Sequence, residues 1–117
     1  MIYSDIFESD GGLYAWTNIR GDRFRLQCCI WVALGDMCAI KKPIVMFTKN
    51  CQTSSIRDGV IIDLTTLEIL LENGALYLEM ENIFKWIGTN HTTLLNHWNG
   101  QDGYSGSEEL IDHLKGF

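Results

Sequence analysis

Hydrophobic and polar residues alternate in the first half of the chain, and this pattern predicts β-strands. Residues 13–19 combine aromatic and β-branched side chains, which are typical of strands. Residues 23–34 begin with strict alternation and then become apolar on both faces, as in a strand at the centre of a sheet. A third strand is expected within residues 37–48, where Pro43 puts it at an edge, at a bulge or in two pieces. Residues 60–62 complete the predicted antiparallel meander.

Helical spacing of apolar residues replaces this alternation in the second half. Four short helices are expected there, over residues 65–72, 81–87, 92–98 and 105–114. The first and the last each begin with a capping box, in which a Thr or Ser and the Glu three residues later satisfy each other's backbone N–H groups. A turn at Gly88 is expected between the second and third helices, and residues 75–80 alternate as a strand does.

The order of these elements predicts an α+β fold, because the strands come first and the helices follow. We expect an N-terminal antiparallel β-meander of about four to five strands, packed with three or four short C-terminal helices. A parallel, doubly wound sheet is excluded, because no helix separates the predicted strands of the first half. A chain of 117 residues is expected to form a single globular domain over residues 1–117.

The four cysteines lack the spacing of a metal or redox motif. No CxxC pair occurs among Cys28, Cys29, Cys38 and Cys51, so zinc-knuckle and thioredoxin-like sites are not indicated. Cys28 and Cys29 are adjacent in a predicted strand and therefore point to opposite faces. The chain does not begin like a secretory signal, and its longest apolar run is too short to span a bilayer. We expect four buried thiols in a reducing cytoplasm, although an even number of cysteines also permits disulfides.

The sequence predicts no catalytic residue, no metal site and no cofactor. The three histidines are His91, His97 and His113, and the spacing of six between the first two does not put them on one helix face. The chain contains no GxSxG, HExxH, GxxxxGKS/T or GxGxxG motif. Two alternatives stay open: a cysteine–histidine dyad that includes Cys51, and a small enzyme whose site has no recognised motif.

Residues 81–101 resemble the helix-turn-helix of small repressors. Gly88 lies where the tight turn requires a glycine, and Ile87 and Leu94 occupy two of the usual apolar positions. The resemblance implies a DNA-binding regulator, which is the alternative function. Residues 91–99 contain no Lys or Arg, however, and neutralisation of phosphates supplies most of the affinity in such contacts. We therefore favour a pair of helices used for packing.

Charge is distributed unevenly along the chain. The formal net charge of −6 argues against general binding of DNA or of an anionic membrane. Residues 1–57 hold seven bases and five acids, a net charge of +2, whereas residues 58–117 hold two bases and ten acids, a net charge of −8. Most acids of the second half fall at polar positions of the predicted helices. Such a pattern is typical both of a solvated surface and of a surface complementary to a basic partner.

From these patterns we expect a non-enzymatic inhibitor that occludes the basic nucleic-acid-binding or active-site surface of a partner protein. That partner would be a nuclease, a toxin or a nucleic-acid-binding effector complex, and no direct binding of nucleic acid or membrane is expected. Short acidic single domains without catalytic motifs are typical of bacterial toxin-immunity proteins and of phage anti-defence inhibitors such as anti-CRISPRs. The predicted partner-binding residues are aromatic anchors and carboxylates, namely Trp98, Asp102, Tyr104, Glu108, Glu109 and Asp112. The sequence does not predict the oligomeric state.

Overall fold

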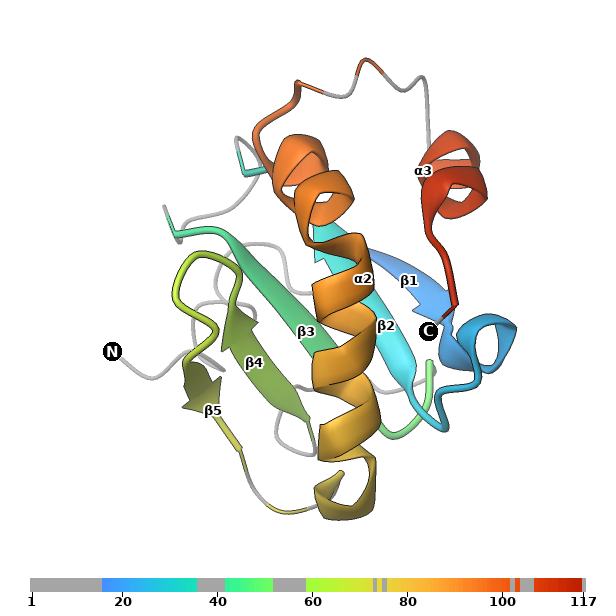
Figure 1. Cartoon of the computed structure of the whole chain (residues 1–117), viewed down its shortest axis with the longest axis vertical. Coiled ribbons are helices and arrows are strands. Elements are labelled where there is room, and N and C mark those ends of the chain that lie inside the picture. Colours follow the sequence, from blue (N-terminus) through green and yellow to red (C-terminus); the bar gives the residue numbers. More distant parts are fainter. Residues whose placement is uncertain are drawn as a thin grey trace.

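A five-stranded antiparallel sheet, crossed on one face by a long helix, forms the framework of the protein (Figure 1). The computed structural model describes residues 16–35, 42–51, 59–72, 74, 76–101, 103 and 107–116. The strands are β1 (Trp16–Arg20), β2 (Cys29–Ala33), β3 (Ile44–Thr48), β4 (Val60–Asp63) and β5 (Ile69–Leu71). They pair in sequence order, so that β3 is central and β1 and β5 are the edges. The predicted antiparallel meander is thereby confirmed.

Two α-helices and two 3-10 helices complete the described part of the chain. They are η2 (Gly21–Phe24), η5 (Tyr77–Glu79), α2 (Met80–Trp98) and α3 (Ser107–His113). The α+β class is confirmed, but the described residues contain one long and one short α-helix instead of three or four short ones. No helix in this part of the chain combines the length and the apolarity that crossing a membrane requires.

Both faces of the sheet are buried, which explains why the three inner strands are apolar except for Thr48 and Asp63 at strand ends. In β3, Val45 and Phe47 belong to the apolar cluster beneath α2, while Ile44 and Met46 belong to a second cluster on the opposite face. Trp86 of α2 lies at the centre of the first cluster and is fully buried. Its ring centroid is 6.1 Å from that of Phe47, and the two rings meet edge to face. The helix is therefore fixed to the sheet by a large aromatic contact.

The helix expected over residues 65–72 is wrong, because this segment forms the hairpin between β4 and β5. The buried carboxylate of Asp63 accepts hydrogen bonds from the backbone N–H groups of Thr65 (2.7 Å) and Thr66 (3.1 Å). The N–H of Leu67 donates to the carbonyl of Asp63, and Leu67 has a φ of 63°, in the left-handed region. Asp63 thus accepts hydrogen bonds from backbone N–H groups that would otherwise begin a helix. The chain forms a turn at this point.

The strand expected over residues 75–80 is also wrong, since η5 occupies residues 77–79 and α2 begins at Met80. From there α2 continues without interruption to Trp98, so the two helices expected over residues 81–87 and 92–98 are one. The resemblance to a helix-turn-helix therefore does not extend to the structure. The buried positions recur at helical spacing along the whole of α2, at Ile83, Trp86, Ile87, Asn90, Leu94 and Trp98. Gly88 lies on the exposed side, where a glycine does not imply a turn.

The strand expected over residues 23–34 begins only at Cys29, because η2 and a short loop come first. The backbone N–H of Leu26 donates to the carbonyl of Gly21 over 2.9 Å, which closes this connection between β1 and β2. Pro43 lies immediately before β3. The central strand therefore loses no ladder donor, and neither the edge position nor the bulge expected from Pro43 occurs. The expected split falls on residues 37–41, which lie outside the described residues.

Cys29 and Cys51 form a disulfide that joins the start of β2 to the residues after β3. The expectation of four free thiols is wrong for these two cysteines. Cys28 is a free and buried thiol, and it lies in the opposite apolar cluster from Cys29, as alternation along a strand predicts. Cys38 lies outside the described residues. Disulfides persist mainly in oxidising compartments, so this bond weighs against the cytoplasmic location, which stays a prediction.

The continuity of α2 predicts the effect of replacing its glycine. We expect Gly88→Ala to raise the free energy of unfolding by about 0.5–1 kcal/mol, because alanine loses less conformational freedom in a helix interior. No atom lies within 4 Å of a methyl group added at Gly88, so no clash offsets this gain. Urea unfolding followed by circular dichroism measures the change. A decrease in stability would show that Gly88 adopts the positive φ of a turn.

The disulfide predicts a dependence of stability on reductant. It closes a loop across a sequence separation of 22 residues, for which loss of the constraint lowers the free energy of unfolding by about 3 kcal/mol. Urea unfolding with and without dithiothreitol measures this difference. Cys51→Ser is the control, because its stability should be low and should not respond to the reductant. Equal stability of the native protein in both conditions would contradict the bond.

Candidate functional site

Helix α3 presents three carboxylates on one short, anchored element. Leu110 of α3 and Leu114, which directly follows the helix, are buried, and Leu110 is not exposed at all. Glu108, Glu109 and Asp112 are exposed on the remaining surface of the helix. The same helical periodicity that buries the leucines therefore directs the acids outward. We call Glu108, Glu109 and Asp112 the α3 acidic surface.

The buried Asn90 of α2 fixes the end of α3 in place. Its side-chain amide donates to the backbone carbonyl of Lys115 (2.9 Å), and its side-chain carbonyl accepts the backbone N–H of Lys115 (2.8 Å). The same amide also donates to the carbonyl of Trp86 over 2.9 Å. Because Asn90 is buried and fully engaged, loss of these bonds would leave polar groups unsatisfied in the core. The α3 acidic surface is thus held at a defined place on the protein.

A hollow of about 380 Å³ lies between β1, η2 and α3. Its lining contains an apolar part and charges of both signs, contributed by Asn18, Ile19, Arg20, Arg23, Glu108, Ile111 and Asp112. The two arginines come from the end of β1 and from η2, whereas the two carboxylates come from α3. Segments about ninety residues apart in the sequence therefore build the two walls of one hollow.

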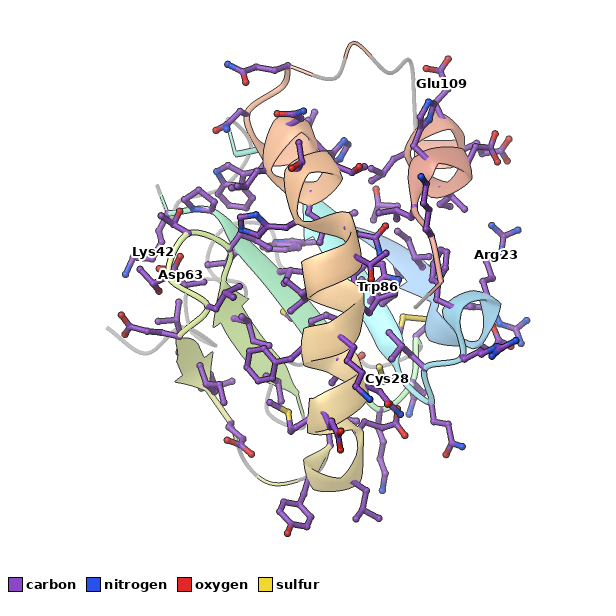
Figure 2. All side chains as sticks on the ribbon, viewed as in Figure 1. Arg23, Cys28, Lys42, Asp63, Trp86 and Glu109 are labelled. Carbon is purple, nitrogen blue, oxygen red and sulfur yellow. A yellow bond between two sulfur atoms is a disulfide. The ribbon has the colours of Figure 1, made fainter. Side chains whose placement is uncertain are left out.

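The charged groups around this hollow are not joined to one another. Arg20 pairs with Asp22 of η2, with 2.7 Å between the guanidinium nitrogen and the carboxylate oxygen. Arg23, Glu108 and Asp112 form no ion pair within 4 Å in the described part of the chain. In Figure 2, Arg23 projects from η2 on the side of the molecule where α3 lies. Side chains of opposite charge thus line the same hollow, and none of the described ion pairs joins its two walls.

The predicted site residues divide into three groups. Glu108, Glu109 and Asp112 are brought together on α3 and are exposed. Asp102 and Tyr104 lie outside the described residues. Trp98 is only 7% exposed and belongs to the second apolar cluster, so it is not on the surface as an anchor.

Two contacts account for the burial of Trp98 at the end of α2. Its ring centroid lies 6.3 Å from that of Trp16, at the start of β1. Gly35 passes so close to the same ring that a methyl group added there would lie 2.5 Å from the indole nitrogen. The indole therefore occupies a slot that the absence of a side chain at Gly35 provides.

Sequence reasoning missed an exposed apolar pair at η5. Tyr77 is 73% exposed and Leu78 is 87% exposed, although both are large hydrophobic residues. The strand expected over residues 75–80 hid them. Extending the helical periodicity of α2 towards the N-terminus would have placed Leu76 and Met80 on the apolar side and this pair off it. Sequence reasoning also missed Arg20 and Arg23, because only the fold brings them opposite the carboxylates of α3.

None of the three described cysteines is available as a nucleophile. The sulfur of Cys51 belongs to the disulfide, so it does not form the dyad that the sequence left open. Burial raises the pKa of the Cys28 thiol to about 12, and the nearby carboxylate of Glu79 contributes to the rise. Cys28 is therefore protonated at neutral pH and a poor nucleophile. The ring of His91 is hydrogen-bonded to the backbone carbonyl of Leu64.

No family model, no curated protein and no solved structure matches this chain. Among the described residues, no group of three or more His, Cys, Asp or Glu side chains is arranged to hold a metal ion. The feature that combines exposure, charge and a fixed position is the α3 acidic surface, with the hollow beside it.

The burial of Trp98 predicts that Gly35 does not tolerate a side chain. We expect Gly35→Ala to lower the free energy of unfolding by about 1–3 kcal/mol, since the added methyl group forces the indole ring to move. Urea unfolding and tryptophan fluorescence measure the two effects. Gly116→Ala is the matched control, because an added methyl group there meets no atom within 4 Å. Unchanged stability of Gly35→Ala would show that Trp98 is free to leave the core and bind a partner.

Proposed function

We propose that this protein is a non-enzymatic inhibitor that binds a basic surface of a partner protein through the α3 acidic surface. One observation carries the proposal: Glu108, Glu109 and Asp112 are exposed on a helix whose apolar side is buried and whose end is clamped by Asn90. Side chains on a rigid element lose less freedom on binding than side chains on a loop. The three charges are thus pre-organised for a partner.

Long-range electrostatics support the same proposal. The second half of the chain carries a net charge of −8, although the whole chain carries only −6. An acidic surface of this kind attracts a basic partner before contact and raises the rate of association. The attraction between exposed charges is screened over about 10 Å at 0.1 M salt, so association should slow as the salt concentration rises.

A protein surface that normally binds phosphate groups has the complementary chemistry. Such surfaces are rich in Lys and Arg, and they occur on nucleases, on toxins that act on nucleic acid and on nucleic-acid-binding effector complexes. Carboxylates placed on such a surface occupy positions that phosphates otherwise take, so the inhibitor competes with the nucleic acid. Toxin-immunity proteins of bacteria and anti-defence proteins of phages, such as anti-CRISPRs, are the classes of inhibitor that this mechanism fits.

Charge reversal on α3 tests the proposal. We compare Glu108→Lys/Glu109→Lys/Asp112→Lys with Glu68→Lys/Glu72→Lys/Glu81→Lys, which reverses three exposed acids elsewhere. Each variant brings the formal net charge from −6 to zero, so only the position of the charges differs. We expect the first variant to weaken binding to the partner captured by the native protein by about a hundredfold, and the second to weaken it far less.

The measurement is calorimetric titration of that partner with each variant, at two salt concentrations. Circular dichroism and urea unfolding confirm that both variants are folded. Two results would overturn the proposal. Binding that survives reversal of the α3 acids removes the acidic surface from the interface, and equal losses in the two variants show that total charge, not α3, determines binding.

A further inference from the structure

The hollow beside the α3 acidic surface lies at the edge of the sheet. Strand β1 pairs with β2 on one side, and no strand pairs with its other side in the described part of the chain. An edge strand presents backbone N–H and C=O groups that an added extended segment can pair with. Asn18 and Arg20 of this strand line the hollow. An extended segment in the hollow would therefore lie next to the backbone N–H and C=O groups of β1 that can pair with an added strand.

The charges that line the hollow are complementary to a ligand with both positively and negatively charged groups. Arg20 and Arg23 form one wall, whereas Glu108 and Asp112 contribute carboxylates from α3. A purely basic segment would be repelled by the guanidinium groups, and a purely acidic segment by the carboxylates. Arg23, Glu108 and Asp112 have no ion-pair partner among the described residues, so their charges remain for a ligand to pair.

We propose that this hollow binds an extended peptide segment of the partner, which adds a strand to β1 and carries alternating basic and acidic side chains. Its basic side chains pair with Glu108 and Asp112. Its acidic side chains pair with Arg23 and share the guanidinium of Arg20 with Asp22. Residues two apart on a strand share a face, so alternate positions of one segment can supply both charges. This inference rests on the proposed function, because it names the part of the partner that reaches α3.

The size and the apolar part of the hollow agree with a peptide. A volume of about 380 Å³ lies at the lower end of the range of about 300–1,000 Å³ that is usual for ligand sites, so the hollow holds part of an extended segment. Ile19 and Ile111 contribute apolar surface to the lining. Such surface suits the uncharged side chains of an extended segment, whereas a phosphate backbone would find only the two arginines attractive and would be repelled by the two acids.

Synthetic peptides test the charge requirement directly. The probe is a peptide of about eight residues, long enough to span β1, in which lysine and glutamate alternate at every second position and valine fills the rest. Two control peptides carry only lysine or only glutamate at the charged positions. We expect the alternating peptide to bind at least about tenfold more tightly than either control in calorimetric titration. A version N-methylated on the edge that faces β1 should lose this affinity, because it lacks the N–H donors of strand pairing.

Paired variants of the protein locate the binding. Arg20→Glu/Arg23→Glu changes the two arginines of the hollow, and Arg25→Glu/Lys49→Glu changes two exposed bases that do not line it. Both variants lower the formal net charge by the same amount. We expect the first to weaken binding of the alternating peptide by about tenfold and the second to change it by less than about twofold. Urea unfolding checks that both are folded.

Each of the following outcomes overturns the inference, and the first of them is still compatible with the proposed function. If the all-lysine peptide binds best, and Arg20→Glu/Arg23→Glu strengthens or does not change its binding, the acidic surface acts without the arginines. If all peptides bind equally or none binds, the hollow is not a peptide site. If size-exclusion chromatography shows a dimer that Arg20→Glu/Arg23→Glu dissociates, the occupant is a second copy of this chain. The proposed function is tested by a different experiment, in which Glu108→Lys/Glu109→Lys/Asp112→Lys is titrated with the captured partner.

Discussion

The packing of α2 across the sheet is the contact on which the remaining structure depends. Trp86 lies in the middle of this helix, and its ring contacts Phe47 of the central strand and Phe24 of η2, with ring centroids 6.1 Å and 5.5 Å apart. One helical turn further on, Asn90 holds the backbone of Lys115 after α3. The helix thus positions both η2, which carries Arg23, and α3, which carries the carboxylates of the hollow. The buried indole N–H of Trp86 has no hydrogen-bond partner among the described residues, and an unsatisfied group of this kind costs about 1–3 kcal/mol.

Local sequence patterns predicted the sheet better than the helices. The three inner strands are buried on both faces, so their sequences are apolar runs that few other structures tolerate. The capping-box pattern at residues 65–68 was misleading, because Asp63, just before it, engages the donors that a helix would leave free. Gly88 was also misleading, because it predicted a break between two helices where the structure has one continuous helix. A glycine on the solvent side of a helix costs little, so it marks no boundary when the buried positions on either side stay in phase.

The candidate site was predictable only where one element determines it. The three acids of α3 share one short segment with Leu110 and with Leu114, which directly follows the helix, and the periodicity within that segment was enough to place them outside. The burial of Trp98 depends on Trp16 and Gly35, which come from distant strands and loops, so no local pattern contains it. Local patterns also do not contain the position of Arg20 and Arg23 opposite α3, or the pairing of Cys29 with Cys51, because distant segments build both features. An even number of cysteines permits a disulfide but does not select the partners.

The meander has a consequence for how the protein folds. Every strand pairs with its neighbour in the sequence, so the sheet can grow by successive hairpins, each of which closes only a short loop. Helix α3 is different, since the group that fixes it is the side chain of Asn90 on α2. The position of α3 therefore depends on α2. A change that displaced this helix would separate the carboxylates from the arginines even if the sheet kept its pairing.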